Sequence, residues 1–302
     1  MISENTSRNQ NIHFKNCWIV GCGDIGKRVA ALFEGKSKTQ NLKAIVSSAE
    51  SAEQCQSQNI EAYALDLDSN YSLGDFNFED ADIFYFAPPT PAGSEDQRLE
   101  RFLQKLDSTT PRRIVLISTT GVYGDSAGEW IDENTPANPK ADRALRRLSA
   151  EQVLQHWSKK TGCEFMILRV PGIYAVERLP IERLKKCLPV INAAEAGYTN
   201  RIHADDLARV CIAAMKSETS NAIINVTDGN PSTMTDYFNQ VADFTGLPRP
   251  PQISLEEAEK TLSAGMISYM KESRRIRNEK MMKLLKIKLN YPDLKSCLTN
   301  NK

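Results

Sequence analysis

The 302-residue sequence predicts an α/β protein built around a doubly wound parallel β-sheet. Short apolar runs typical of buried strands recur along the first two thirds of the chain, and most of the gaps between them have the periodicity of amphipathic helices. A glycine-rich turn directly follows the first run. The composition, with 41% hydrophobic and 25% charged residues, is that of an ordinary globular protein rather than a disordered chain.

The strands and helices can be assigned in order from these patterns. The expected strands are the apolar runs Cys17–Val20, Lys43–Val46, Glu61–Leu65, Ile83–Ala87, Ile114–Ser118, Phe165–Arg169 and Ala222–Val226. Helices are expected over Lys27–Glu34, over about Lys140–Lys160 and within Leu255–Leu285. Between the fourth and fifth strands, Ser94 and Gln97 have the spacing of a capping box, which predicts that a helix with an apolar stripe begins there.

The charge balance and the cysteines exclude several classes of protein. Lys+Arg and Asp+Glu both number 38, so the formal net charge is zero, and neither nucleic acid nor an anionic membrane is an expected partner. The first apolar run, Cys17–Val20, is too short for a signal peptide or a membrane span, which favours a cytoplasmic protein. The seven cysteines are scattered without a C-x-x-C pair, so we expect reduced, mostly buried thiols and neither disulfides nor a metal site.

The glycine-rich turn has the context of a dinucleotide-binding motif. The segment Gly21-Cys22-Gly23-Asp24-Ile25-Gly26 follows a predicted strand and opens a predicted helix, as G-x-G-x-x-G does in a Rossmann-type domain. Gly21 permits the tight turn, Gly23 lets the backbone approach a pyrophosphate, and Gly26 allows the helix to pack closely on the strand. The amides of Asp24 and Ile25 then face the phosphates at the helix N-terminus. The sequence therefore predicts a Rossmann-type domain that binds NAD or NADP.

Three short segments at the ends of later strands complete the predicted cofactor site. Ser47-Ser48 follows the second strand where an Asp or Glu would select NAD, so the choice between NAD and NADP stays open with a slight preference for NADP. Asp66-Leu67 follows the third strand and could contact the adenine, although an Asp there could also cap a helix. Ala87-Pro88 ends the fourth strand and could form the floor under the cofactor or simply stop the strand.

Prolines after Arg169 break the regular alternation and predict a second domain. We expect a dinucleotide-binding domain at residues 13–169 plus 201–226 and a smaller, partly discontinuous substrate-binding domain at residues 170–200 plus 227–302. Residues 1–12 are expected to form a flexible tail.

Five further motifs occur in order along the chain. They are Ser118-Thr119-Thr120-Gly121-Val122-Tyr123-Gly124, Asp132-Glu133-x-x-Pro136, Leu168-Arg169-Val170-Pro171-Gly172-Ile173-Tyr174, Arg201-Ile202-His203-Ala204-Asp205-Asp206-Leu207-Ala208 and Ser273-Arg274-Arg275-Ile276-x-Asn278-x-Lys280. In this combination the chain resembles the extended short-chain dehydrogenase/reductase superfamily over about residues 15–297, in particular its NAD-dependent sugar-nucleotide epimerases and dehydratases. It is similar to the atypical members around the bacterial protein YeeZ. The resemblance implies NAD or NADP as cofactor, Pro171 beside it, and a small-molecule substrate such as a nucleotide sugar.

The resemblance also identifies where the family's catalytic residues would stand. A Ser or Thr at the place of Thr119 binds the substrate oxygen in the family, while a Tyr-x-x-x-Lys pair does the proton chemistry. Glu151 fixes a register in which Arg143 takes the place of the Tyr and Arg147 that of the Lys. Arginine stays protonated near neutral pH and cannot act as a base. Arg147 could instead hold the ribose hydroxyls and Arg143 an anionic substrate group, or both could belong with Arg146 to a solvated basic face.

Two other motif residues have alternative roles. Tyr123 could line the substrate pocket or pack beneath its loop. His203 is expected mainly to cap and pack at the start of a helix, and less to take part in binding. The resemblance leaves the oligomeric state open between a monomer and a homodimer.

Two functions are compatible with these residues. The first is an NAD(P)-dependent oxidoreductase or epimerase in which Thr119 polarises the substrate oxygen and a water or another side chain carries the proton. The second is a catalytically inactive NAD(P)-binding protein that reports redox or metabolic state by docking to a partner. The second follows from the replacement of both Tyr and Lys, whereas the retained Thr119 and Pro171 segments favour the enzyme.

Overall fold

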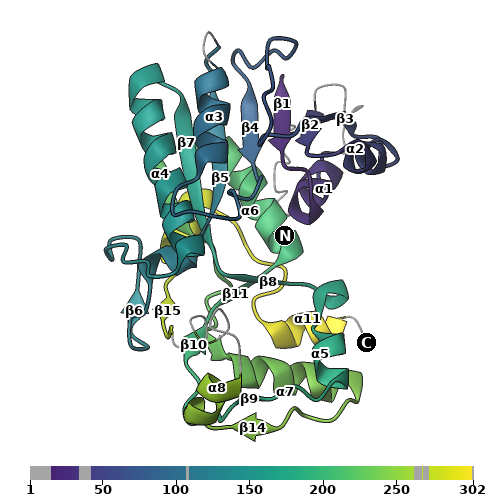
Figure 1. The fold of residues 1–302 in the computed structure, drawn as a ribbon, viewed down its shortest axis with the longest axis vertical. Helices are drawn as coiled ribbons and strands as arrows, with labels where there is room; N and C mark the ends of the chain where they lie inside the picture. The colour runs from purple at the N-terminus through teal and green to yellow at the C-terminus, as the bar shows by residue number, and fades with distance from the viewer. Residues whose placement is uncertain (1–14, 34–41, 107–108, 262–266, 268–271, 301–302) are drawn as a thin grey trace, which may run out of the picture.

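The computed structural model describes residues 15–33, 42–106, 109–261, 267 and 272–300 (Figure 1). Its centre is a seven-stranded sheet in the order β12-β7-β5-β4-β1-β2-β3, in which every neighbouring pair is parallel. The strands are β1 (Cys17–Val20), β2 (Leu42–Val46), β3 (Glu61–Ala64), β4 (Asp82–Tyr85), β5 (Arg113–Thr119), β7 (Glu164–Val170) and β12 (Ala222–Asn225). The tail expected at residues 1–12 lies outside the described residues.

The strand order confirms the predicted doubly wound sheet. The chain builds outward from β1 through β2 to β3, then crosses back to β4 and continues outward through β5, β7 and β12. Strands β1 and β4 are therefore neighbours whose connections leave in opposite directions, and a crevice opens at their carboxyl ends. All seven predicted strands form, with ends within two residues of the expected ones.

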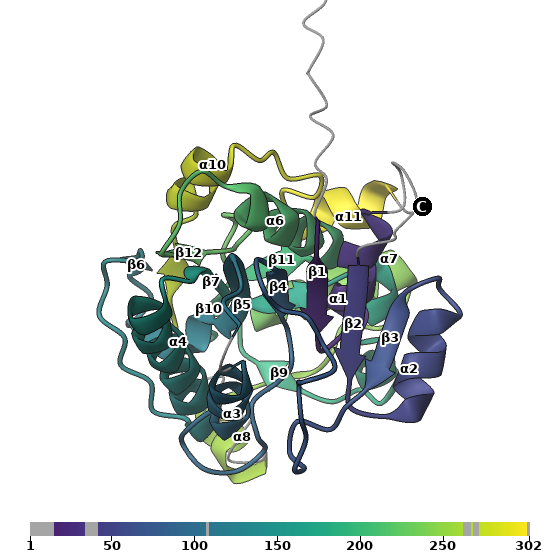
Figure 2. The ribbon, with the colours of Figure 1, turned by 90° about the horizontal axis from the view of Figure 1, so that it is seen from above.

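Helices cover both faces of the sheet (Figure 2). Two of them pack on one face, and the others pack on the opposite face. On the first face lie α3 (Gln97–Lys105) and α4 (Asp142–Thr161), and on the second α1 (Asp24–Ala31), α2 (Ala49–Gln56), α6 (Ala204–Lys216) and α10 (Glu279–Leu285). Along β1, Trp18 and Val20 are buried toward the first face and Cys17 and Ile19 toward the second. Strands buried on both faces explain why the sequence shows continuous apolar runs.

Helix α3 begins later than the capping box predicted. Its N-cap is Asp96, whose Oδ1 accepts a hydrogen bond from the Leu99 amide at 3.1 Å, so the prediction that Ser94 caps this helix was wrong. Asp96 is selected because it is 1% exposed and its own amide donates to Ser149 Oγ on α4 at 3.3 Å. The predicted apolar stripe does lie on the sheet, with Leu99 and Phe102 fully buried.

A buried ion pair joins α4 to the central strands. The Glu151 carboxylate accepts hydrogen bonds from Arg169 Nε at 3.1 Å and Nη2 at 2.8 Å, and from Ser118 Oγ at 2.5 Å. The Arg169 guanidinium lies 4.7 Å from the ring centre of Tyr123, whose hydroxyl donates to Asn225 Oδ1 at 2.8 Å. A buried ion pair is stable only when both charges are present and their hydrogen bonds are made. This network therefore holds β5, β7, β12 and α4 in one arrangement.

A second hydrophobic core lies beyond the carboxyl ends of the sheet strands (Figure 1). It includes buried side chains of α5 (Ile181–Lys185), α7 (Met234–Thr245) and α11 (Leu294–Asn300). The other elements beyond the sheet are β6 (Trp130–Ile131), β8 (Gly172–Tyr174), β9 (Val190–Ile191), β10 (Tyr198–Thr199), β11 (Arg201–His203), β13 (Ser232–Thr233), β14 (Gln252–Ile253), α8 (Leu255–Thr261), β15 (Arg275–Ile276) and the short 3-10 helices η1 (Thr120–Tyr123) and η2 (Val176–Arg178).

On the ground of this separate core we propose that the chain forms two domains, divided near residues 170, 200 and 227. We call the part with the second core the smaller domain. The C-terminal segment contributes to both cores, because Met281 and Leu285 of α10 are buried against the main sheet while Leu294 and Cys297 are buried in the smaller domain.

Two local expectations are also confirmed. His203 Nδ1 accepts the Asp205 amide at 3.2 Å and caps α6, and its ring stacks on Tyr291 with the centres 3.8 Å apart. Six of the seven cysteines are buried, as expected, and Cys187 is exposed. Within the described ranges, no helix combines the length and the apolar character that crossing a membrane requires.

The buried carboxyl of Asp228, three residues after the end of β12, leads us to expect that stability depends on pH. Burial raises the pKa of its carboxyl to about 7, and nearby Asp293 and Asp206 add to the effect, although the Asn230 amide and Arg201 oppose it. A carboxyl whose folded pKa exceeds its unfolded one binds its proton more tightly in the folded state. Stability from this group is therefore greatest in acid and is lost as pH rises through the folded pKa.

Between about pH 5 and about pH 8 this loss should amount to roughly 2 kcal/mol of the free energy of unfolding. Asp228→Asn keeps an oxygen acceptor for the Asn230 amide at a site that cannot titrate. Urea unfolding at the two pH values should show a smaller pH dependence in this variant than in the unmodified protein. Equal dependence in the two proteins would contradict the assignment.

Candidate functional site

The glycine turn is shaped so that a side chain would not fit at its first position. Gly21 has a φ of +90°, and a Cβ there would lie 2.4 Å from the backbone nitrogen of Ala87, two residues after the end of β4. The Gly21 amide also donates to Ile45 O at 2.8 Å. Glycine is therefore required here, because the turn passes directly against the neighbouring strands.

The start of helix α1 has the properties of an anion site. Gly23 is the N-cap and offers no side-chain cap, so the amides of Asp24, Ile25 and Gly26 keep their donor capacity. A Cβ at Gly23 would meet nothing within 4 Å, which means that open space lies in front of the turn. At Gly26 a Cβ would lie only 3.1 Å from Ile19 Cγ2, so glycine there permits close packing of helix and strand. The turn fits a pyrophosphate in the way that the sequence predicts.

A cavity of about 320 Å³ extends from this turn along the carboxyl ends of β1 to β4. It is lined by the predicted cofactor residues Gly21, Ser47, Asp66, Leu67, Ala87 and Pro88, and also by Ile45, Val46, Leu65 and Arg98. The predicted segments after four separate strands thus meet in one place.

Polar side chains at the edge of this cavity have defined partners. Ser48 Oγ accepts the Ser51 amide at 3.2 Å and caps α2, which leaves Ser47 as the serine that lines the cavity. Asp66 Oδ1 accepts the Asp68 amide at 2.9 Å in a turn, so it caps no helix. Arg98, which sequence reasoning missed, is held by hydrogen bonds to Asp68 and to the carbonyl of Pro88.

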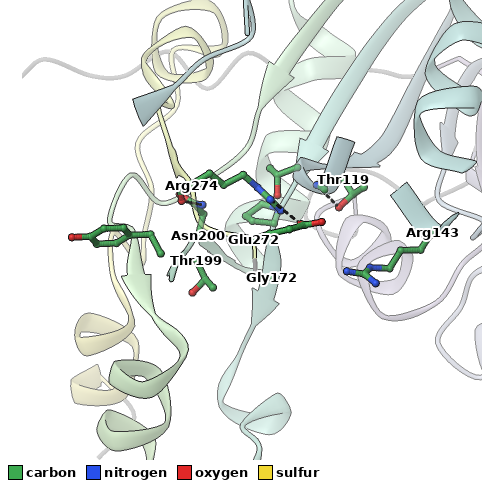
Figure 3. A pocket seen from close by; sticks show the side chains of 11 residues that line it. Thr119, Arg143, Gly172, Thr199, Asn200, Glu272 and Arg274 are labelled. Atoms are coloured by element: carbon green, nitrogen blue, oxygen red, sulfur yellow. Dashed lines mark hydrogen bonds and ion pairs between the residues drawn. The ribbon is translucent and has the colours of Figure 1, made fainter. Parts of the chain in front are cut away.

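A second cavity of about 190 Å³ lies where the sheet meets the smaller domain (Figure 3). Thr119 at the end of β5, Arg143 on α4 and Pro171 after β7 line it together. The remaining lining residues are Thr120, Gly121, Gly172, Tyr198, Thr199, Asn200, Glu272 and Arg274. Three of the predicted site residues therefore line one cavity together with polar residues from the C-terminal half of the chain.

The C-terminal segment that carries Glu272 and Arg274 is fixed by several hydrogen bonds. Arg274 Nη1 donates to Glu272 Oε2 at 2.8 Å and to Gly124 O at 2.6 Å, and Asn200 Nδ2 donates to Arg274 O at 3.0 Å. Between these two residues, the carbonyl of Ser273 accepts a hydrogen bond from the Gly128 amide at 2.9 Å. Glu272 was not selected from the sequence, although it directly precedes the last of the five motifs, which could have pointed to it.

Two predicted residues lie elsewhere. Tyr123 is 2% exposed beneath the η1 loop, where it packs against Arg169 and lines neither described cavity. Arg147 also lines neither, and its Nη1 is buried without a hydrogen-bond partner among the described residues. Burial lowers the pKa of Arg147, while the charge of nearby Asp96 opposes that shift. A buried donor without a partner has capacity for a ribose hydroxyl or a water.

No group of three His, Cys, Asp or Glu residues within the described part of the chain could hold a metal ion.

Comparisons with known proteins agree with this geometry. The family model described as NAD(P)H-binding matches residues 21–218. A conserved protein of unknown function from Silicibacter pomeroyi is similar over 94% of this chain and 97% of its own, with 26% identity and a TM-score of 0.81. UDP-glucose 4-epimerase from Thermotoga maritima, solved with UDP-glucose, covers 94% of this chain and 96% of its own at 16% identity and a TM-score of 0.76, which shows a shared fold.

A similar curated sequence is the "Putative UDP-glucose 4-epimerase" of Methanocaldococcus jannaschii. It is 25% identical over 146 residues, which is 44% of this chain and 47% of that protein, so the chain spans about half the length of that relative. The NAD(P)H-binding match covers the glycine turn from Gly21 onward, strands β2 and β4, and the residues that line the cavity at their carboxyl ends. The chain therefore belongs to the NAD(P)H-binding family, with the fold of the NAD-dependent epimerases and dehydratases and NAD or NADP as its cofactor.

Proposed function

We propose that this protein is an NAD(P)-dependent oxidoreductase or epimerase whose substrate is a nucleotide sugar or another small hydroxyl or carbonyl compound with an anionic group. The observation that carries the proposal is the 190 Å³ cavity, where Thr119 and Arg143 from the sheet domain line one space with Glu272. When bound, NAD(P) would supply hydride transfer. Gly21, Ser47, Asp66 and the start of α1 would hold it.

Thr119 is suited to bind the reacting oxygen of the substrate. Its Oγ1 accepts the Gly121 amide at 3.1 Å, which fixes the side chain and leaves the hydroxyl proton free to be donated. A donor held in place before the substrate arrives stabilises negative charge that develops on a carbonyl oxygen.

Glu272 is the group to which we assign the proton transfer. Arg143 and Arg274 remain protonated near neutral pH, whereas a carboxylate can accept the hydroxyl proton of an alcohol as it becomes a carbonyl and return it in the reverse direction. In Figure 3 the Glu272 side chain extends toward Thr119. Its side chain is only 10% exposed and is positioned by the ion pair with Arg274. Glu272 thus has the acid/base role that a tyrosine has in the short-chain dehydrogenase/reductase superfamily.

Arg143 is suited to bind an anionic group of the substrate. It is an exposed residue of α4 whose guanidinium points toward the cavity (Figure 3). A guanidinium recognises carboxylate or phosphate through two parallel hydrogen bonds. This supports a phosphate- or carboxylate-bearing substrate over a neutral one.

The test is a turnover assay with both oxidised and reduced NAD and NADP against nucleotide sugars and small carbonyl compounds, each with and without a carboxylate or phosphate. Activity should be confined largely to the anionic compounds. Glu272→Gln should lower kcat by about 100-fold, because general acid–base catalysis contributes a rate enhancement of at least about that size. The variant should also alter the pH profile of kcat and leave the affinity for NAD(P)H unchanged. Arg143→Gln should raise KM at least about tenfold, as expected when a charged hydrogen bond is lost.

A matched control is Glu256→Gln, which removes a carboxylate paired with Lys260 on an exposed helix of the smaller domain. It should leave kcat and KM unchanged. Absence of turnover across the panel at saturating cofactor would overturn the enzymatic proposal and leave a protein that binds NAD(P)H without chemistry.

A further inference from the structure

An arginine of the smaller domain reaches the anion site at the start of α1. Arg178 is the last residue of η2, which follows β8, and its guanidinium donates to Asp24 Oδ2. Asp24 is the first residue of α1 and follows the open N-cap Gly23. Residues 154 positions apart in the chain therefore meet beside the amides that fit a pyrophosphate.

The pair belongs to a larger set of charges around Arg28. Arg28, one turn further along α1, contacts Asp24 at 3.0 Å and also pairs with Asp205 and Glu177. Three carboxylates thus share two guanidinium groups. Although partial burial alone would raise it, hydrogen bonds from Arg28 and Arg178 lower the pKa of Asp24, so its carboxylate is ionised at neutral pH.

The negative charge of Asp24 would repel the pyrophosphate of a bound dinucleotide unless it is neutralised. A pyrophosphate is itself anionic, and at the start of α1 it would lie close to the Asp24 carboxylate. The three carboxylates exceed the two arginines by one charge, and the loss of either arginine would make that excess two. Arg28 forms ion pairs with three carboxylates, whereas Arg178 pairs with Asp24 alone among them.

We propose that Arg178 is a positioning residue for the cofactor: by neutralising Asp24 from the smaller domain, it makes the glycine turn able to accept the dinucleotide pyrophosphate. The inference rests on the proposed NAD(P) binding at this turn and adds the smaller domain to the cofactor site. Arg178 acts through Asp24 and requires no contact of its own with the phosphates.

Nicotinamide fluorescence titrations with NADPH and NADH test this with four proteins: the unmodified chain, Arg178→Ala, Asp24→Asn and the double variant. Arg178→Ala should bind the tighter of the two dinucleotides about tenfold more weakly, the effect of one uncompensated charge near the surface. The double variant should bind within about twofold of Asp24→Asn alone, because the carboxylate with which Arg178 pairs is then already absent. The tenfold loss should shrink at high salt.

Two controls separate this role from a structural one. Arg249→Ala removes another paired arginine of the smaller domain, bonded to Asp243, and should leave affinity unchanged. Adenosine, which lacks the pyrophosphate, should compete equally well in all four proteins.

Wild-type affinity in Arg178→Ala would overturn the inference. So would a tenfold loss that persists in the Asp24→Asn background, because Arg178 would then not act through Asp24. If the unmodified chain binds neither dinucleotide, the proposed function fails together with this inference, whereas a result limited to Arg178→Ala concerns the inference alone.

Discussion

Replacing Glu151 by leucine is expected to lower the free energy of unfolding by about 3–5 kcal/mol, because the substitution leaves the Arg169 guanidinium buried without its counter-ion. The side chains of Glu151 and Arg169 are 1% and 6% exposed, so water cannot replace the lost partner. Ser118 Oγ would lose its acceptor as well. Urea unfolding of the variant at neutral pH measures the effect.

The double variant Glu151→Leu with Arg169→Met tests the cause. With both charges removed, part of the loss should be recovered, since two apolar side chains can replace a buried ion pair at little cost. Glu256→Leu, at an exposed pair with Lys260, should change stability by less than about 0.5 kcal/mol. If Glu151→Leu is as mild as this surface control, the ion pair does not hold the sheet to α4 as described.

Gly23→Asp is expected to weaken dinucleotide binding about 1,000-fold without destabilising the fold. A Cβ at this position meets nothing within 4 Å, and Asp is a favourable N-cap for α1. The new carboxylate would occupy the helix amides and repel a pyrophosphate at close range. Fluorescence titration with NADPH and NADH measures the affinity, and thermal unfolding should show an equal or higher Tm.

The control for this variant is Thr233→Asp, which places the same charge at the N-cap of α7 in the smaller domain. It should bind NADPH and NADH as the unmodified chain does. Undiminished binding by Gly23→Asp would mean that the phosphates lie elsewhere than at the start of α1.

The strands of the sheet could be predicted because the patterns that indicate them are short stretches of the sequence. Runs such as Cys17–Val20 are apolar at every position, as strands covered on both faces must be, and the glycine turn fixes which strand comes first in the motif. The start of α3 could not be predicted in the same way. Asp96 rather than Ser94 is the N-cap of α3, and its backbone amide donates to Ser149 of α4. No local sequence pattern contains that contact.

Some residues of the candidate site could likewise be predicted from local sequence, whereas others are placed by tertiary contacts. Ser47, Asp66 and Ala87 each follow a strand, so parallel topology alone brings them to one edge of the sheet. Arg147 was placed on α4 by register, but register alone does not indicate which cavity a side chain lines, and Arg147 lines neither of the two described. Glu272 and Arg178 reach their sites from the smaller domain, and that approach depends on tertiary packing.

The central claim is that the start of α1 and the 320 Å³ cavity bind NAD or NADP, and direct titration of the unmodified chain with NADPH and NADH tests it. We expect saturable binding of at least one dinucleotide with a blue shift and rise of nicotinamide fluorescence, NADPH being preferred because Ser47 lines the cavity where an acid would repel the 2′-phosphate. Failure of both dinucleotides to bind at millimolar concentration would contradict the claim.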